Sequence, residues 1–338
     1  MKVFITGGAG FIGCNSADHF LKQGHEVVVF DNLSRMGTPT NLAWLQANHG
    51  ERLHFVEGDI RSYEQLTQTI GGADVVLHLA GQVAVTTSVV NPREDFEINA
   101  VGTFNVLEAV RHAAPQAALI YASTNKVYGG MEEIGVVERN GRYTYTDYPY
   151  GIDESFNLDF HSPYGCSKGA GDQYVVDYAR IYGLRTLVFR QSCIYGQRQF
   201  GIEDQGWVAH LVIATLFQRP INIYGDGKQV RDLLNVNDLI RAYEAGLAHI
   251  DTLSGTAFNI GGGPQNTLSV WTEFGPLLAS LAGREVPITH HAWRPGDQRV
   301  FIADIRKAKA LLGWEPTLSP QEGITDLYRW VEANPMLF

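Results

Sequence analysis

Residues 2–13 read KVFITGGAGFIG, and this stretch decides the fold of the N-terminal half of the chain. A short apolar run, Val3–Thr6, leads directly into three glycines with the spacing Gly7-x-x-Gly10-x-x-Gly13, and a helical pattern follows. A strand, a glycine turn and a helix N-terminus together form an anion site, because the backbone can approach a pyrophosphate closely and the first helical N–H groups face it. The alternative interpretation is an α/β domain that keeps the turn and binds no nucleotide.

A second strand, Glu26–Phe30, ends in Asp31, and this acidic side chain indicates which dinucleotide would bind. A carboxylate at this place accepts hydrogen bonds from both ribose hydroxyls and repels a 2′-phosphate, so the pattern predicts NAD rather than NADP. A third strand, Leu53–Val56, precedes Asp59 and Ile60, which are candidate adenine contacts at the same edge of the sheet. An ordinary strand-end turn is the alternative for Asp59.

Length and composition exclude several classes of protein. A chain of 338 residues predicts about two domains, and its net charge of −10, without any run of Lys or Arg, argues against nucleic-acid binding. No apolar run approaches the roughly 20 residues of a membrane span, and no signal peptide is apparent. The three distant cysteines, Cys14, Cys166 and Cys193, predict reduced thiols in a cytoplasmic protein, and the histidine spacing predicts no metal site.

Strand and helix signals alternate through the first half, which predicts a parallel sheet with right-handed crossovers. We expect a cofactor-binding domain over residues 1–195 and a substrate-binding domain over 196–338, with some segments returning to the first domain. Residues 130–160 show no clear period, which is typical of either a lid or a mobile insertion; their place between two catalytic stretches favours a lid. The other expected elements are strands at 73–77, 117–122, 185–189, 221–224 and 257–260, and helices at 41–48, 92–112, 162–182, 207–218, 304–312 and 320–334.

The sequence YGCSK places Tyr164 and Lys168 four residues apart, on one face of the expected helix. A tyrosine with a pKa near about 10 is a poor base at neutral pH, but a neighbouring ammonium and an oxidised nicotinamide both favour the phenolate. Tyr164 can then take a hydroxyl proton while a hydride leaves the same carbon. Alone, this spacing usually reflects surface packing; with Thr124 at a strand end and a dinucleotide turn, it predicts catalysis by all three residues.

These features together resemble the extended short-chain dehydrogenase/reductase family that acts on nucleotide sugars. The resemblance rests on TGGAGFIG (6–13), Asp31, STNKVYG (123–129), YGCSK (164–168) and RPGDQ (294–298), the last being similar to a nucleotide-diphosphate contact loop. Longer stretches are similar to the CDP-paratose (CDP-tyvelose) 2-epimerases of that family: DNLSR (31–35), HLAGQVAVTTS (78–88), STNKVYGG (123–130), LDFHSPYGCSKGAGDQY (158–174) and GDGKQVRD (225–232).

The resemblance implies a Rossmann-type doubly wound parallel sheet with a smaller mixed α/β substrate-binding domain at the C-terminus. It also implies a homodimer or homotetramer that packs through the helices at about 92–112 and 162–182. Tyr164 would be the base and acid, Lys168 its activator and ribose anchor, and Thr124 a partner of the reacting sugar oxygen. Implied NAD contacts, besides Tyr164 and Lys168, are Gly7, Gly10, Phe11, Ile12, Gly13, Asp31, Asn32, Ser34, Arg35, Asp59, Ile60, Leu79, Ala80, Gln82, Asn99 and Ser123. Implied substrate contacts are Thr124, Asn125, Lys126, Gln191, Cys193, Arg198, Gln205, Arg231, Arg294 and Asp297. For the two arginines at 231 and 294, a surface ion pair is the alternative.

Two departures from related enzymes narrow the implied reaction. Dehydratases of the family carry an Asp-Glu pair where this chain has Asn125 and Lys126, which disfavours loss of water. Many 4-epimerases carry Asn where Cys193 stands, which suits a sugar bound with C2 toward the nicotinamide. The resemblance therefore implies NAD-dependent epimerisation at C2 of a CDP-sugar through a 2-keto intermediate, on either CDP-paratose/CDP-tyvelose or CDP-glucose/CDP-mannose. The alternatives are a 4-epimerase or another NDP-sugar oxidoreductase, and a non-catalytic NAD-binding sensor.

Overall fold

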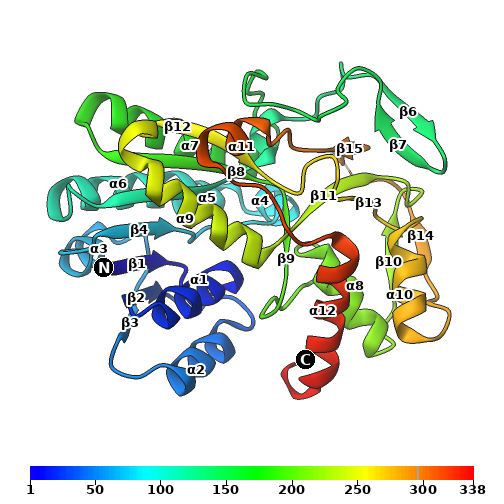
Figure 1. The fold of residues 1–338 in the computed structure, drawn as a ribbon, viewed down its shortest axis with the longest axis horizontal. Coiled ribbons are helices and arrows are strands. Elements are labelled where there is room, and N and C mark those ends of the chain that lie inside the picture. Colours follow the sequence, from blue (N-terminus) through cyan, green and yellow to red (C-terminus); the bar gives the residue numbers. More distant parts are fainter. Residues whose placement is uncertain (295–296) are drawn as a thin grey trace. The chain divides into compact units, whose positions relative to one another are not determined.

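The computed structural model describes residues 1–294 and 297–338, and Figure 1 shows its elements in chain order. Pro295 and Gly296, part of the expected diphosphate loop, lie outside the described residues. The chain forms two compact units, each assembled from three segments. The first comprises Met1–Val127, Phe160–Arg190 and Ile240–Phe258, and the second comprises Tyr128–Asp159, Gln191–Leu239 and Asn259–Phe338. The change of unit between residues 190 and 191 lies close to the expected boundary at 195, whereas residues 128–159 belong to the second unit and residues 240–258 return to the first.

The first unit is built on a seven-stranded parallel sheet, as the sequence predicts. The order β12-β8-β5-β4-β1-β2-β3 places β1 at the point where the strand order reverses, next to β2 on one side and β4 on the other. Val, Ile and Phe side chains dominate these strands, and burial on both faces explains their nearly continuous apolar runs. The strands are β1 (Lys2–Thr6), β2 (Glu26–Asp31), β3 (Leu53–Glu57), β4 (Val75–His78), β5 (Ala118–Thr124), β8 (Arg185–Gln191) and β12 (Thr256–Ile260).

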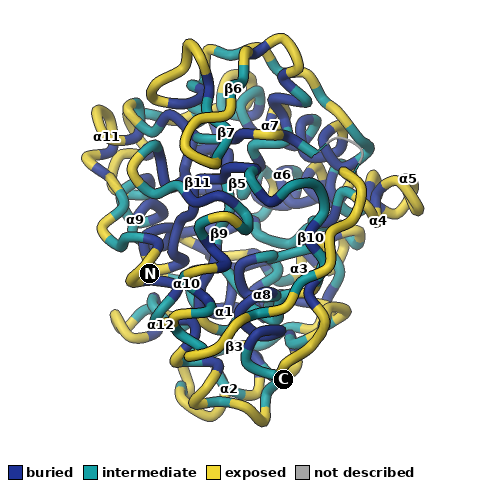
Figure 2. Tube along the Cα trace, turned by 90° about the vertical axis from the view of Figure 1, so that its right-hand side faces the viewer, coloured by how far each residue is buried: buried dark blue, intermediate teal, exposed yellow. Residues whose placement is uncertain are grey.

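Helices cover the sheet and share one large apolar core with it. Leu66 of α3, Val106 of α6 and Val175 of α7 belong to the same buried cluster as the strand residues Phe4 and Leu119. Figure 2 shows β5 in dark blue, in agreement with its buried side chains. The helices of this unit are α1 (Phe11–Lys22), α2 (Thr38–Asn48), α3 (Tyr63–Thr69), α4 (Val85–Val90), α5 (Pro92–Phe96), α6 (Gly102–Ala113), α7 (Ser162–Tyr182) and most of α9 (Val236–Leu253).

The helix expected at 92–112 is present, and it changes its hydrogen-bonding pattern in the middle. A π-helical turn, Glu97–Val101, separates α5 from α6. Asn99 lies in this turn, and its buried amide bonds to groups outside the helix, so the wider turn places a polar side chain where an α-helix would not. Asparagine is mildly unfavourable inside a helix, and these buried hydrogen bonds account for its presence here. Single wide turns of this kind occur frequently at functional sites.

The second unit is a mixed α/β assembly with its own core. Val212 and Leu211 of α8, Leu233 of β11, Leu278 of α10 and Leu327 of α12 belong to one buried cluster. Its strands are β6 (Val136–Arg139), β7 (Arg142–Tyr145), β9 (Cys193–Tyr195), β10 (Asn222–Tyr224), β11 (Val230–Asn235), β13 (Thr267–Ser269), β14 (Thr289–His291) and β15 (Val300–Phe301). Its helices are α8 (Trp207–Leu216), α10 (Phe274–Ala282), α11 (Arg306–Leu312) and α12 (Pro320–Ala333).

The segment 130–160, expected to lack regular structure, contains a β-hairpin of β6 and β7. Asn140 and Gly141 form its turn, with φ of 53° and 78°, which is the pattern of the tight hairpin turns that favour Asn-Gly. Arg142 binds both carboxylate oxygens of Glu273 at 2.8 and 3.0 Å, and the Tyr143 backbone N–H donates to the Lys228 carbonyl. The expectation of an irregular segment was therefore wrong, because Asn140 and Gly141 form a tight turn that pairs the two short strands.

Candidate active site

The glycine turn after β1 leaves no room for side chains. Gly7 has φ of +68°, and a Cβ there would lie 2.8 Å from the Ala80 backbone. A Cβ on Gly13 would lie only 2.2 Å from the Gly7 carbonyl oxygen. Gly10 stands at the N-cap of α1 and provides no side-chain cap, so the first N–H groups of that helix keep their capacity to bind an anion.

Asp31 ends β2 directly beside this turn. One carboxylate oxygen accepts the Ala9 N–H at 3.0 Å, and the other accepts the Leu33 N–H at 2.8 Å. Burial raises the pKa of Asp31, and these backbone donors partly offset the effect. The end of β2 therefore holds the Asp31 carboxylate beside the glycine turn, which is the arrangement predicted for a ribose contact.

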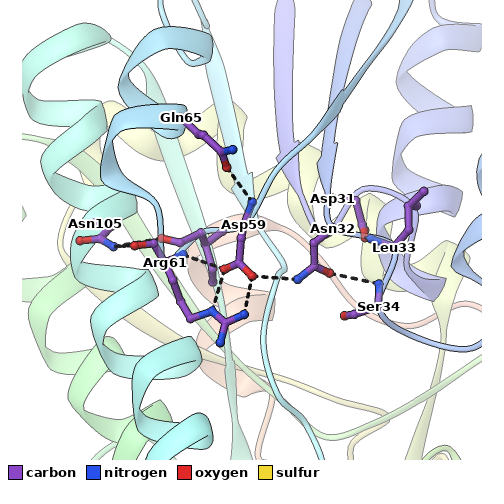
Figure 3. A network of polar contacts seen from close by, with 9 residues as sticks. Asp31, Asn32, Leu33, Ser34, Asp59, Arg61, Gln65 and Asn105 are labelled. Carbon is purple, nitrogen blue, oxygen red and sulfur yellow. Dashed lines mark hydrogen bonds and ion pairs between the residues drawn. The ribbon is translucent and has the colours of Figure 1, made fainter.

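The ends of β2 and β3 meet in the polar network drawn in Figure 3. The Asn32 amide donates to Asp59 Oδ2 at 3.0 Å, and Arg61 holds the same carboxylate through Nε and Nη2 at 3.0 and 2.7 Å. Burial alone would raise the pKa of Asp59, but the hydrogen bonds from Arg61 and Asn32 lower it below its usual value. Asp59 also accepts the Arg61 N–H at 2.9 Å, as a strand-end turn residue does, and it joins the two loops expected to border an adenine.

The remaining predicted cofactor residues lie along the same edge of the first unit. Leu79 and Ala80 follow β4, and their N–H groups donate to Thr6 Oγ1 at 3.1 and 3.2 Å. The Ser34 N–H donates to Asn32 Oδ1 at 3.2 Å. The others lie at the start of α1 (Phe11 and Ile12), after β3 (Ile60), after β2 (Arg35) and at the end of β5 (Ser123).

Tyr164 lies in the first turn of α7, where the structure fixes both its backbone and its ring. The Tyr164 N–H donates to Ser88 Oγ at 3.1 Å, which ties α7 to α4. Burial raises the pKa of Tyr164 to about 12, while a hydrogen bond with Thr124 and the charge of Arg35 act in the opposite direction. This corrects the expectation that the lysine neighbour would lower the pKa of Tyr164, because in the protein alone burial has the larger effect.

Lys168 follows one helical turn later and is almost completely buried. Its Nζ donates to the Ala122 carbonyl at 2.6 Å and lies 4.2 Å from the centre of the Tyr121 ring. Burial lowers the pKa of Lys168 to about 7, against the raising effect of Asp172 and Asp95. The predicted triad of Thr124, Tyr164 and Lys168 is therefore gathered in the first unit, between the end of β5 and the start of α7.

We expect that replacing Lys168 with methionine raises the free energy of unfolding. Because the pKa of Lys168 is about 7 in the folded protein and 10.5 unfolded, the unfolded chain binds the extra proton between these pH values. The contribution of this group to stability is present above pH 10.5 and is lost as the pH falls through 7. Because burial of the charged ammonium is unfavourable below pH 7, urea unfolding should show a gain of about 1–4 kcal/mol at pH 6 and a smaller one at pH 10. A loss of stability at pH 6 would contradict this.

The sequence analysis assigned no role to Asp172 and Arg190, two buried residues that lie next to the triad. Asp172 lies one turn beyond Lys168 and is bound by Arg190 through Nε and Nη2, both at 3.0 Å. Ser123 Oγ donates to the same carboxylate at 2.7 Å. The spacing Tyr164, Lys168, Asp172 continues the four-residue repeat on one helix face and was the available signal.

The predicted substrate residues of the second unit fall into two groups. Arg231 of β11 lies 2.8 Å from the Asp297 carboxylate and also donates to the Gln298 carbonyl at 2.7 Å. Arg294 instead lies 3.1 Å from Asp204 and 3.8 Å from the centre of the Tyr224 ring. Arg231 is buried, so the alternative of a surface ion pair does not describe it.

The other predicted substrate positions are placed as follows. Cys193 lies on β9 opposite Leu233 of β11, and Gln191 ends β8. Arg198 has φ of +65° and lies over the Trp330 ring, and Gln205 forms a bridge with Ile202. In the first unit, Asn125 and Lys126 begin a short 3₁₀ turn directly after Thr124.

The structure also bears on metal binding and membranes. Within the described part of the chain, no three His, Cys, Asp or Glu side chains cluster closely enough to hold a metal ion. Over residues 1–294 and 297–338, no helix combines the length and apolar character needed to cross a bilayer.

The fold and this site place the chain among known proteins. A family model described as GDP-mannose 4,6 dehydratase matches residues 4–327, and the chain belongs to this family, within the extended short-chain dehydrogenase/reductases. The CDP-paratose 2-epimerase of Salmonella typhi is 48% identical over 340 residues, which cover 98% of this chain and 100% of that protein.

Solved structures agree with this assignment. A dTDP-glucose 4,6-dehydratase from Streptomyces venezuelae, solved with NAD bound, has a TM-score of 0.85 and 28% identity over 100% of this chain and 99% of that one. A UDP-glucose 4-epimerase from Thermotoga maritima, solved with UDP-glucose, has a TM-score of 0.84 and 30% identity over 99% and 100% of the two chains.

Proposed function

We propose that this protein is an enzyme that inverts the configuration at C2 of a CDP-sugar and uses NAD as a bound cofactor. The observation that carries this proposal is the full-length 48% identity to a CDP-paratose 2-epimerase, in a chain whose Thr124, Tyr164 and Lys168 share one site. CDP-paratose and CDP-glucose are both candidate substrates, since they share the reacting C2 hydroxyl.

The residues present fit NAD. Gly7 and Gly13 leave a backbone cradle that a Cβ would fill, and α1 begins there without a side-chain cap. Asp31 supplies the ribose acceptor beside that cradle, and the loops joined through Asp59 border the expected place of the adenine. When bound, the oxidised nicotinamide supplies the capacity to accept a hydride from C2 and return it.

Side chains of the protein itself carry out the proton transfer. Tyr164 takes the proton of the C2 hydroxyl as the C2–H bond breaks, which leaves a ketone at C2. The protonated Lys168 stabilises the Tyr164 phenolate that accepts this proton, and Thr124 hydrogen-bonds the sugar oxygen. After the ketone turns its other face, Tyr164 gives the proton back to the oxygen. The reaction has no net oxidation, so we expect the cofactor to stay bound through turnover.

The nucleotide end of the substrate is assigned to residues of the second unit. We propose that Arg231 and Arg294 hold the diphosphate, since a guanidinium offers forked donors that match phosphate oxygens. Asp297 and Asp204, which now contact these arginines, would be displaced or rearranged on binding. The other proposed sugar and nucleotide contacts are Thr124, Asn125, Lys126, Gln191, Cys193, Arg198 and Gln205.

A 4-epimerase is the second candidate, because a putative UDP-glucose 4-epimerase of Methanocaldococcus jannaschii is 30% identical over 98% of this chain. Incubation with CDP-, UDP- and dTDP-glucose and with CDP-paratose, followed by NMR of the products, separates the candidates. The proposal expects inversion at C2 of a CDP-sugar. Inversion at C4 would favour the second candidate, and a 4-keto-6-deoxy product would mean that Asn125 and Lys126 do not prevent dehydration.

We also propose a cytoplasmic homodimer that packs through α6 and α7. Phe104 and Tyr174 lie on these helices with 40% and 49% of their surface exposed. The centres of their two rings are 6.0 Å apart. Such exposed aromatic pairs are typical of interfaces.

We expect Tyr174→Asp to give a monomeric mass by light scattering. The matched control is Tyr63→Asp on α3, where 41% of the tyrosine is exposed, and it should leave the mass unchanged. A dimeric mass for Tyr174→Asp would contradict the proposed interface.

A further inference from the structure

Asp95 is a buried acid in the first unit to which neither the sequence analysis nor the proposed reaction gives a role. It lies on α5, is 1% exposed, and accepts three side-chain hydrogen bonds. Ser167 Oγ donates to Oδ2 at 2.5 Å, while the amides of Gln82 and Asn99 donate to Oδ1 at 2.9 and 3.2 Å. Each carboxylate oxygen therefore has at least one hydrogen-bond partner, and an ionised carboxylate can accept all three of these bonds.

The partners of Asp95 connect it to the catalytic residues. Ser167 immediately precedes Lys168 on α7, and its hydroxyl also contacts the Tyr164 carbonyl at 3.2 Å. Asn99 Oδ1 and Lys168 Nζ border the same small space at Gly81, where a Cβ would lie 3.0 and 3.9 Å from them. Asp95 is thus linked through Ser167 to the Tyr164 backbone, and its partner Asn99 lines the same space at Gly81 as the Lys168 ammonium.

The charged and titratable groups around this pair come from several elements. Three titratable side chains interact with Lys168: Asp95 on α5, Asp172 on the same helix as Lys168, and His78 on β4. The Lys168 ammonium also lies over the Tyr121 ring. Asp172 is already neutralised by Arg190, and burial keeps the pKa of His78 near 3, so this imidazole is neutral at pH 7. Tyr164 faces Asp95 and, from the loop after β2, Arg35. Asp95 is therefore the one carboxylate among these named groups that has no basic side chain bound directly to it.

We propose that Asp95 is a positioning residue for the reaction, whose negative charge keeps Lys168 protonated in its buried site and whose hydrogen bonds hold the start of α7. This inference rests on the proposed function for its kinetic readout but not for its structural one. Burial raises the pKa of Asp95 itself, and the hydrogen bonds from Ser167 and Gln82 offset this only in part.

The first test compares the pH profiles of kcat for the wild-type protein and Asp95→Asn. Removing the negative charge lowers the pKa of Lys168, because the ammonium loses a favourable partner, and lowers the pKa of Tyr164, because the phenolate loses a repulsive one. Both limbs of the profile should therefore move to lower pH by about one unit. A purely structural role would lower the whole profile without moving its limbs, and that result would overturn the proposal.

A second readout does not depend on the sugar substrate. In protein labelled at the lysine ε-position, NMR titration follows the Lys168 signal, which is assigned by its absence in Lys168→Arg. The Lys168 pKa should fall by about one unit in Asp95→Asn and return toward the wild-type value in Asp95→Glu. An unchanged Lys168 pKa would overturn the proposal, even if the wild-type enzyme turned out to act at C4 rather than C2.

Two further variants provide an alternative to Asp95→Asn and a control for overall charge. Ser167→Ala removes a donor that favours the Asp95 carboxylate, so it should shift the Lys168 pKa in the same direction by less, and it serves if Asp95→Asn does not fold. Asp177→Asn removes an exposed carboxylate from the same helix, and both readouts should stay at the wild-type values. A shift in Asp177→Asn as large as in Asp95→Asn would also overturn the proposal, because it would reflect the overall charge.

Discussion

The Tyr164→Phe variant is expected to lose epimerase activity by about 10² to 10⁴-fold in kcat while it keeps its bound NAD. The change removes one oxygen, the atom that takes and returns the hydroxyl proton, and it leaves Thr124 and Lys168 in place. Because the ring is buried, phenylalanine fills the same space and the fold should be maintained. NMR assay of the sugar product and absorbance of the NAD released on denaturation measure the two effects separately.

The matched control is Tyr174→Phe, on the same helix but with 49% of the side chain exposed. It should change kcat less than twofold, since Tyr174 lies outside the proposed proton path. If Tyr164→Phe kept the wild-type rate, the residue would not be the base. The non-catalytic sensor would then become the better interpretation of an NAD-binding protein with this fold.

The second large effect is expected from Gly13→Ala. A Cβ at this position would lie 2.2 Å from the Gly7 carbonyl oxygen and 2.6 Å from the Gly8 Cα, so the turn must open or α1 must shift. Either movement displaces the backbone N–H groups that face the pyrophosphate. We expect purified protein that carries less than a tenth of the wild-type NAD and has correspondingly little activity, with a loss of stability of about 1–3 kcal/mol.

Gly50→Ala is the control, because a Cβ there would meet no atom within 4 Å. It should keep full NAD content and activity. Gly7→Ala should behave like Gly13→Ala, since its φ is +68° and its Cβ would lie 2.8 Å from the Ala80 backbone. Full NAD occupancy in both glycine variants would mean that the cofactor does not lie against this turn.

The parts of the fold that sequence predicts well are those in which local residues determine local structure. The run Val3–Thr6 with its glycines, and the strand that ends in Asp31, depend on short-range sterics and burial, and the parallel sheet follows from their alternation with helices. The Tyr164–Lys168 spacing likewise places two groups on one face without any knowledge of the tertiary structure.

Other features depend on contacts that no local pattern encodes. The π-helical turn at Glu97–Val101 accompanies the hydrogen bonds of Asn99 to Gln82 and Ser167, which are distant in sequence. The hydrogen bonds of Asp95 likewise come from three separate segments. The raised pKa of Tyr164 has the same origin, because burial is a property of the assembled unit and outweighs any neighbour visible in the sequence.

The most direct test of the proposed chemistry uses CDP-glucose or CDP-paratose, whichever the enzyme converts, with deuterium at C2. Proton abstraction by Tyr164 from the hydroxyl predicts that the deuterium leaves as hydride and returns to the same carbon. NMR of the product should therefore show an inverted C2 that retains its deuterium. Loss of the deuterium to solvent would contradict the account, because it would mean that a proton is removed from C2 itself.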